Sequence, residues 1–133
     1  LITVFGAGGD KDPLRRRTLP EIVIRRCRVG VITLDNPRSE SPQAIIGTTA
    51  HHWRMLASLV TNPAELVVEP DRPAAIVIAL ELARPGDTVV LAGKGHETGQ
   101  IFHDRVVPHD DYAIAAEWLK RHHPLPGPAG ALR

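Results

Sequence analysis

The sequence predicts an α/β domain: a Rossmann-like three-layer sandwich with a mostly parallel sheet, a C-terminal hairpin strand and helices on both faces. Short β-branched, apolar runs alternate with segments of helical periodicity, an order that implies βαβ units and a parallel sheet. The chain has 133 residues, of which 43% are hydrophobic and 23% are charged. That composition suits one soluble domain with a buried core.

The first expected strand, Leu1–Phe5, is a short apolar run that stops at a glycine. In the loop after it, Gly6–Asp12, glycines allow backbone conformations that other residues avoid. A helix is expected within Thr18–Arg26, and Pro13 and Pro20 leave its start undefined.

The second strand, Val29–Thr33, is again rich in β-branched residues and leads into the turn Asp35–Arg38. The second residue of this turn precedes proline and is therefore pushed out of the α conformation. Ser41 and Pro42 are of the types preferred at an N-cap and in a first helical turn. A helix is expected from there, with further helix over 47–62.

The second half of the chain continues the alternation, with an aspartate at the start of each expected helix. The expected elements are a strand at Glu65–Glu69, a helix at Arg72–Ala83 capped by Asp71, a strand at Thr88–Ala92, a hairpin pairing Gln100–Phe102 with Arg105–Val107, and a helix from Asp110 or Asp111 to Arg121. Residues 124–133 lack periodicity and are expected to form a flexible tail.

Three polar loops each follow a strand directly: Gly6–Asp12, Asp35–Arg38 and Gly93–Glu97. Because loops at the carboxyl ends of parallel strands emerge at one edge of the sheet, we expect these three to converge. That edge is where open α/β sheets bind ligands.

The side chains of these loops have mixed charges. Arg38 offers a planar set of donors suited to a carboxylate or phosphate, and Lys11 is a second cation. Glu97 offers an acceptor suited to an ammonium group, and Asp35 and Asn36 add further acceptors. Mixed signs fit a zwitterion better than a polyphosphate.

Other classes of function find little support. The glycine loop does not match the G-x-G-x-x-G fingerprint of dinucleotide-binding proteins, because Lys11 stands in place of the last glycine. Gly93-Lys94 lacks the earlier glycine and the following Ser or Thr of a phosphate-binding loop. A net charge of +1 and 4% aromatic residues argue against nucleic acid. No apolar run approaches the ~18 residues of a membrane helix. Cys27, the single cysteine, forms no internal disulfide, and the histidines have no metal-ligand spacing.

The motifs GAGGDKD at 6–12, DNPR at 35–38 and AGKGHE at 92–97 resemble those of the C-terminal domain of Mur ligases, of the diaminopimelate-adding kind. Glu69-Pro70-Asp71-Arg72 and Arg84-Pro85-Gly86-Asp87 also fit that family. The resemblance extends to about Arg121, and DNPR and GKGHE in this order are specific.

The resemblance implies that residues 1–123 are the amino-acid-presenting domain of an ATP-dependent ligase. Such a ligase adds meso-diaminopimelate to UDP-MurNAc-L-Ala-D-Glu in peptidoglycan precursor synthesis. ATP and Mg²⁺ would be bound mainly by a central domain, and the UDP-MurNAc-dipeptide by other domains, all outside this chain. The chain starts at Leu1 rather than methionine and is expected to be a piece of a longer polypeptide. The resemblance implies that this piece is inactive alone, and a cytoplasmic, monomeric protein is expected.

The resemblance also implies roles for single residues. Arg38 would bind the far carboxylate of diaminopimelate, beside Asp35 and Asn36. Gly93 and Glu97 would hold the same end of the amino acid. No catalytic residue and no metal ligand is implied in this chain. The substrate-binding residues so expected are Lys11, Asp35, Asn36, Arg38, Gly93 and Glu97.

Two departures from the family pattern affect the first loop. Lys11, expected to meet the carboxylate next to the reacting amine, stands where the family usually has arginine. Segment 13–20, with three consecutive arginines, differs from the usual helix start and leaves the first helix in doubt. Alternative functions are another Mur-type ligase, of lysine-adding, cyanophycin or folylpolyglutamate type, or a non-catalytic amino-acid-binding fragment.

For several residues a second interpretation stays open. Arg38 could pair with Glu40 on a solvated turn. Lys94 could contact phosphate or only solvent. His96 is expected to brace its loop through hydrogen bonds.

Overall fold

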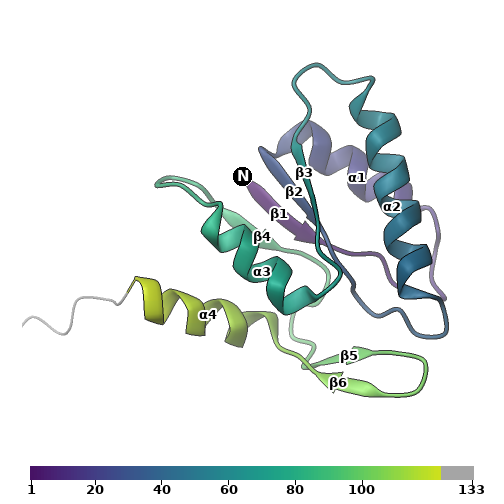
Figure 1. Ribbon diagram of the computed structural model, residues 1–133, viewed down its shortest axis with the longest axis vertical. Helices are drawn as coiled ribbons and strands as arrows, with labels where there is room; N and C mark the ends of the chain where they lie inside the picture. The colour runs from purple at the N-terminus through teal and green to yellow at the C-terminus, as the bar shows by residue number, and fades with distance from the viewer. Residues whose placement is uncertain (124–133) are drawn as a thin grey trace, which may run out of the picture.

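A four-stranded parallel sheet forms the centre of the computed structural model, which describes residues 1–123 (Figure 1). Its strand order is β3-β2-β1-β4, and β5 and β6 form a separate antiparallel pair. The expected tail at 124–133 lies outside the described residues. The elements are β1 (Ile2–Phe5), α1 (Arg15–Arg26), β2 (Val29–Ile32), α2 (Pro42–Ala57), β3 (Glu65–Val68), α3 (Arg72–Glu81), β4 (Val89–Leu91), β5 (Gly99–Ile101), β6 (Val106–Pro108) and α4 (Asp111–His122).

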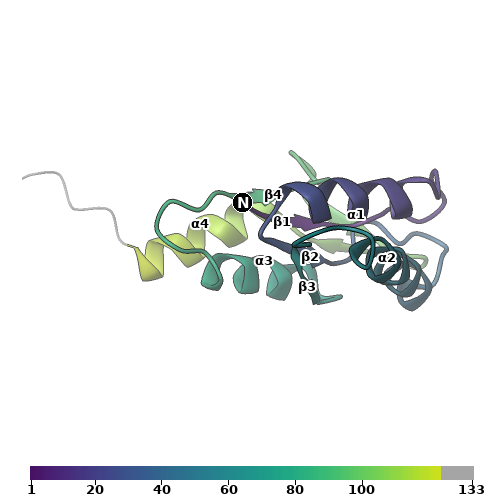
Figure 2. The same ribbon diagram turned by 90° about the horizontal axis from the view of Figure 1, so that it is seen from above.

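Helices cover both faces of this sheet, which confirms the predicted fold class. Figure 2 shows α1 and α3 on opposite sides of the strands. Side chains alternate along each strand, so β1 sends Phe5 to one face and Ile2 and Val4 to the other. The first face packs on α1 and α2, and the second packs on α3, with α4 beside α3. The result is the expected three-layer arrangement.

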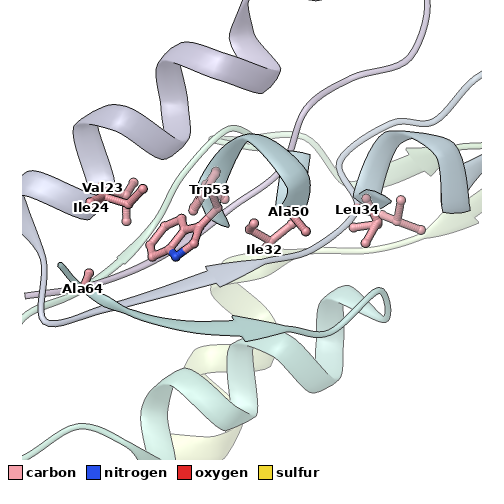
Figure 3. Close-up of a cluster of buried hydrophobic side chains, with 9 residues drawn as sticks. Val23, Ile24, Ile32, Leu34, Ala50, Trp53 and Ala64 are labelled. Carbon is pink, nitrogen blue, oxygen red and sulfur yellow. The ribbon is translucent and has the colours of Figure 1, made fainter. Parts of the chain in front are cut away.

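The core between the sheet and helices α1 and α2 is centred on Trp53 (Figure 3). This indole lies over β2, where Gly30 leaves room for it: a Cβ atom at position 30 would lie 2.4 Å from the ring. Val23 of α1 packs against the same point. Glycine at position 30 therefore sets how closely the two helices approach the sheet.

Three helices begin where the sequence predicts, each at a side-chain cap. Ser41 Oγ accepts a hydrogen bond from Ala44 N at the start of α2. Asp71 and Asp110 do the same at the starts of α3 and α4. These caps satisfy backbone N–H groups that the helix leaves without partners.

Two helix boundaries differ from the prediction. Helix α1 begins at Arg15, before the expected start at Thr18. The sequence does not mark this start, because Leu14 provides no side-chain cap and Pro20, which suggested a boundary, lies inside the helix. Helix α2 ends at Ala57 rather than near residue 62, since the chain then turns and reaches a left-handed backbone at Asn62 (φ +53°) before a proline. Among the helices described over residues 1–123, none is long and apolar enough to cross a membrane.

Candidate functional site

A pocket of about 470 Å³ lies at the carboxyl ends of β1, β2 and β4, where the three polar loops converge. It contains all six residues that the sequence analysis placed at the site. We call it the mixed-charge pocket. Its lining residues are Gly8, Lys11, Asp12, Arg15, Asp35, Asn36, Arg38, Gly93 and Glu97.

The loop after β1 lies directly against the turn after β2. The backbone N–H of Gly9 donates to the carbonyl of Asn36 at 2.8 Å. A Cβ atom at position 9 would lie 1.8 Å from the carbonyl oxygen of Pro37, so only glycine permits this contact. The close approach of the two backbones brings the first and second polar loops into one wall of the pocket.

Arg38 has a strained backbone at the edge of this wall. Its φ of +53° is in the left-handed region, which arginine rarely adopts. The backbone N–H donates to Ile101 O at 3.0 Å, and Nη1 donates to Gly9 O at 2.9 Å. These bonds, and a bridge between Arg38 and Phe102 of the hairpin segment, hold the residue in this conformation. The half-buried guanidinium lines the pocket.

Lys94 lies beneath the pocket and connects its second and third loops. The side chain is fully buried, and Nζ donates to Asn36 Oδ1 at 2.6 Å and to Gly99 O at 2.8 Å. Nζ also lies 3.3 Å from Glu97 Oε2. Asn36 Nδ2 donates to that same Glu97 oxygen at 3.0 Å. Asn36, Lys94 and Glu97 thus form one hydrogen-bonded group.

Asp35 and Gly93 face each other across the same end of the pocket. Asp35 Oδ1 lies 3.4 Å from Lys94 Nζ, and its backbone carbonyl accepts a hydrogen bond from Gln100 Nε2 at 2.8 Å. Gly93 has a φ of +109°, which favours glycine, and a Cβ atom there would be 3.7 Å from Asp35 Oδ2. The loop after β4 can therefore pass close to this carboxylate.

The pKa of Glu97 lies below its usual value. The main cause is the hydrogen bond from Asn36, followed by the hydrogen bond and charge of Lys94, with a contribution from the Arg38 charge. Glu97 is accordingly ionised at neutral pH. Its side chain is 43% exposed, so the carboxylate can be reached from the pocket.

Lys11 and Arg15 also line the pocket. Both side chains are exposed and positively charged. The next residue, Arg16, is instead buried and donates to both carboxylate oxygens of Glu40, at 2.8 and 2.7 Å. Arg16 holds the pKa of Glu40 below its usual value. Glu40 therefore pairs with Arg16 and not with Arg38, which leaves Arg38 to the pocket.

A second buried ionic group lies behind the site. Arg72, fully buried at the first position of α3, makes two hydrogen bonds to Asp111 of α4, at 2.8 and 2.7 Å. It also donates to Ala92 O and Leu34 O, the residues directly before Gly93 and Asp35. His109 Nε2 lies 2.6 Å from Asp111 Oδ1. This group anchors the strand ends that carry two of the pocket loops.

Sequence reasoning left open or missed several of these contacts. The sequence leaves open whether Lys94 contacts phosphate or only solvent, and in the structure its side chain is buried between Asn36 and Glu97. His96 was expected to brace its loop, but it is exposed and makes no hydrogen bond with the residues described here, so this prediction is wrong. Lys94 supplies that support instead. The first helix, left in doubt, is formed and is held by buried Arg16.

The mixed-charge pocket is suited to a molecule that carries both positive and negative charges. It offers guanidinium and ammonium groups to carboxylates, and carboxylates to an ammonium group. It does not resemble a triphosphate or metal site, because its carboxylates are interleaved with cations. Over residues 1–123, no three His, Cys, Asp or Glu side chains gather as a metal site would require.

Comparison with known proteins places this geometry among characterised families. Residues 1–95 match the family model described as "Mur ligase, glutamate ligase domain". A protein of Solibacter usitatus (strain Ellin6076), named UDP-N-acetylmuramoyl-L-alanyl-D-glutamate–2,6-diaminopimelate ligase, is 43% identical over 120 residues, which cover 90% of this chain and 23% of the relative. A protein of the same name from Streptomyces coelicolor is 43% identical over 125 residues, covering 91% and 24%.

A solved structure gives the same result in three dimensions. The structure of a ligase of that name superposes with a TM-score of 0.77 at 29% sequence identity, covering 92% of this chain and 24% of the other. The chain thus spans about a quarter of the length of the curated relatives it matches.

Proposed function

The chain belongs to the Mur ligase family, as its motifs predict, and from this premise we propose that it presents diaminopimelate in an ATP-dependent ligase. The ligase would join meso-diaminopimelate to UDP-MurNAc-L-Ala-D-Glu, as the names of the similar proteins suggest for those proteins. The observation that carries the proposal is the convergence of the expected site residues in one pocket of mixed charge. Residues 1–123 would constitute the C-terminal domain of the enzyme.

Within this proposal, each charged group of the pocket has a partner on the substrate. Arg38 would bind the far carboxylate, and Glu97 the neighbouring ammonium group. Lys11 would meet the carboxylate next to the amine that reacts. Lysine has the ammonium but not the far carboxylate, so it would leave Arg38 unpaired at a cost of ~1–3 kcal/mol. The pocket should therefore prefer diaminopimelate to lysine.

ATP and Mg²⁺ would be bound by parts of the ligase outside this chain. The described residues offer neither a phosphate-binding glycine loop nor a carboxylate cluster suited to Mg²⁺. ATP would supply the free energy of amide-bond formation, and this chain would hold and orient the incoming amino acid. Since ATP and nucleotide-linked sugars are cytoplasmic substrates, we also infer a cytoplasmic location.

A chimeric ligase tests the proposal. This chain replaces the matching C-terminal quarter of the Streptomyces coelicolor relative, and addition of meso-diaminopimelate or L-lysine to UDP-MurNAc-L-Ala-D-Glu is measured. The chimera is expected to form the diaminopimelate product and to use lysine at least 10-fold less efficiently, the effect of about 1.4 kcal/mol.

The same chimera with Arg38→Ala serves as the matched control, and it should lose most of its preference for diaminopimelate. A folded chimera, verified by its melting transition, that uses both amino acids equally or neither would contradict the proposed function.

A further inference from the structure

Lys94 is buried in a place where lysine is rarely found. The residue retains 2% of its surface exposure, yet it lies under a loop at the edge of the sheet. An ammonium group is removed from water only at a high cost unless charges and hydrogen bonds compensate for it. Here Nζ has two oxygen acceptors within 2.8 Å, on Asn36 and Gly99, and two carboxylates within 3.4 Å.

The first consequence concerns the Asn36 amide. Its Oδ1 accepts hydrogen bonds from Lys94 Nζ at 2.6 Å and from Ile101 N at 2.9 Å. Two donors at one end require that end to be the oxygen, so Nδ2 must point the other way, toward Glu97 Oε2. Lys94 and the backbone N–H of Ile101 together orient the amide so that its Nδ2 end meets Glu97.

The second consequence concerns the charge of the pocket. Asp35 and Glu97 both lie within ion-pair distance of the same Nζ atom. Without the hydrogen bond and charge of Lys94, the pKa of Glu97 would be higher. Asp35 Oδ1 is buried and accepts no hydrogen bond from the residues described here, so it depends on the Lys94 charge.

Other charged groups also act on Glu97. Arg38 of the turn after β2 lowers its pKa. Lys11, Asp12 and Arg15, from the loop after β1 and the start of α1, line the same pocket. Of all these groups, Lys94 is the buried one that contacts both Asn36 and Glu97.

We propose that Lys94 is a positioning residue: its buried ammonium group fixes the Asn36 amide and keeps the Glu97 carboxylate charged and aimed to receive the ammonium group of the bound amino acid. This inference rests on the proposed function for the identity of the ligand. It concerns a residue that need not touch the ligand, since Lys94 acts through Asn36 and Glu97.

The test compares the full 133-residue chain with Lys94→Met, Lys94→Gln and, as the matched control, Lys120→Met. Lys120 is an exposed lysine of α4 away from the pocket. The side-chain carboxyl of Glu97 is titrated by carbon-13 NMR without ligand. Affinity for meso-diaminopimelate is measured by calorimetry, and urea unfolding shows that each variant is folded.

In both Lys94 variants the titration midpoint of Glu97 is expected to rise, and the affinity for meso-diaminopimelate to fall at least 10-fold. On acidification, the variants should lose the remaining affinity at a higher pH than the wild type does. Lys120→Met should change neither. A folded Lys94→Met variant with the wild-type Glu97 midpoint would overturn the proposal, because a purely structural lysine would alter stability alone.

Two further outcomes are also decisive. If both Lys94 variants fail to fold, the wild-type titration decides: a Glu97 midpoint at or above the ordinary glutamate value of ~4.3 overturns the proposal. If wild-type chain does not bind meso-diaminopimelate, the ligand assignment fails, while the shift of the Glu97 midpoint still reports the role of Lys94.

Discussion

Arg38 combines an unfavourable backbone with a side chain placed for binding. A φ of +53° places Cβ close to the following carbonyl group, which costs about 1 kcal/mol in a residue other than glycine. Hydrogen bonds to Ile101 and Gly9 hold the residue there. Strain of this kind persists at functional sites when the surroundings determine the conformation. We interpret the strain as the cost of directing a guanidinium into the pocket.

Glycine and alanine at position 38 should therefore have different effects on stability but the same effect on binding. Arg38→Gly is expected to unfold with a free energy about 1 kcal/mol higher than Arg38→Ala, because glycine tolerates the left-handed backbone. Both should weaken meso-diaminopimelate binding about 10- to 100-fold, through loss of a charge-assisted contact. Urea unfolding and calorimetry measure the two effects.

Asn62 provides the control, since its φ is also +53° but it lies outside the pocket. Asn62→Gly should leave the affinity unchanged. Equal stabilities for Arg38→Gly and Arg38→Ala would show that the backbone at this position is unstrained. Unchanged affinity in both would remove Arg38 from the binding site.

Single residues differ in how far the sequence reveals them. Arg38 and Glu97 were found because each follows a strand end, and parallel topology brings strand ends together. The sequence could not decide the surroundings of Lys94, because a lysine between two glycines is usually solvated. Its burial depends on Gly99 and Asn36, which close over it only in the folded chain.

At the scale of elements, the ion pair between Arg72 and Asp111 joins α3 to α4 and to the strand ends. Burial alone would raise the pKa of Asp111, but the hydrogen bonds and charges of Arg72 and then His109 outweigh burial and lower it. The carboxylate is thus ionised in the folded chain. Breaking such a pair leaves a buried charge without compensation.

Arg72→Met is expected to lower the free energy of unfolding by about 3–5 kcal/mol, because it leaves the buried Asp111 carboxylate with His109 as its remaining side-chain partner. The double variant Arg72→Met/Asp111→Leu should lose less than the single variant, since it leaves no buried charge. Arg121→Met is the matched control: its pair with Glu117 is exposed, and its loss should cost less than ~1 kcal/mol. Urea unfolding at neutral pH gives all three values.

The same pair predicts how the stability of the chain changes at acidic pH. Because the folded pKa of Asp111 is depressed below the usual aspartate value of 3.8, its stabilisation is present above that value and is lost as pH falls through the lower, folded pKa. The stability difference between wild type and Asp111→Asn should shrink only below about pH 4. Two results would contradict this account of the pair. One is an Arg72→Met variant that is no less stable than Arg72→Met/Asp111→Leu. The other is a stability difference between wild type and Asp111→Asn that does not change at acidic pH.

Elements were predicted best where local chemistry marks their ends. The caps Ser41, Asp71 and Asp110 were visible in the sequence, and each begins a helix. The start of α1 was not, because Leu14 provides no side-chain cap and Pro20 suggested a break. Helix α1 is stabilised by tertiary contacts instead, among them the buried bonds of Arg16 to Glu40.

At the scale of the whole molecule, the strand order explains how distant motifs meet. Strand β1 lies between β2 and β4, so the loops after these three strands are neighbours in space. In the sequence the same loops are far apart, since the first begins at residue 6 and the last ends at residue 97. This arrangement could be inferred from the sequence, because alternating strands and helices predict a parallel sheet. The β5–β6 hairpin was also predicted, but its separation from the main sheet and the contact of Gly99 with Lys94 could not be, since they depend on packing.

The most direct test of the central claim is a residue-resolved NMR titration of the chain with meso-diaminopimelate and, separately, with L-lysine. The account predicts that meso-diaminopimelate shifts the amide signals of Asp35, Asn36, Arg38, Gly93 and Glu97, and that lysine at the same concentration shifts them at least 10-fold less. Shifts located elsewhere, or equal shifts with both amino acids, would contradict the assignment of this pocket to diaminopimelate.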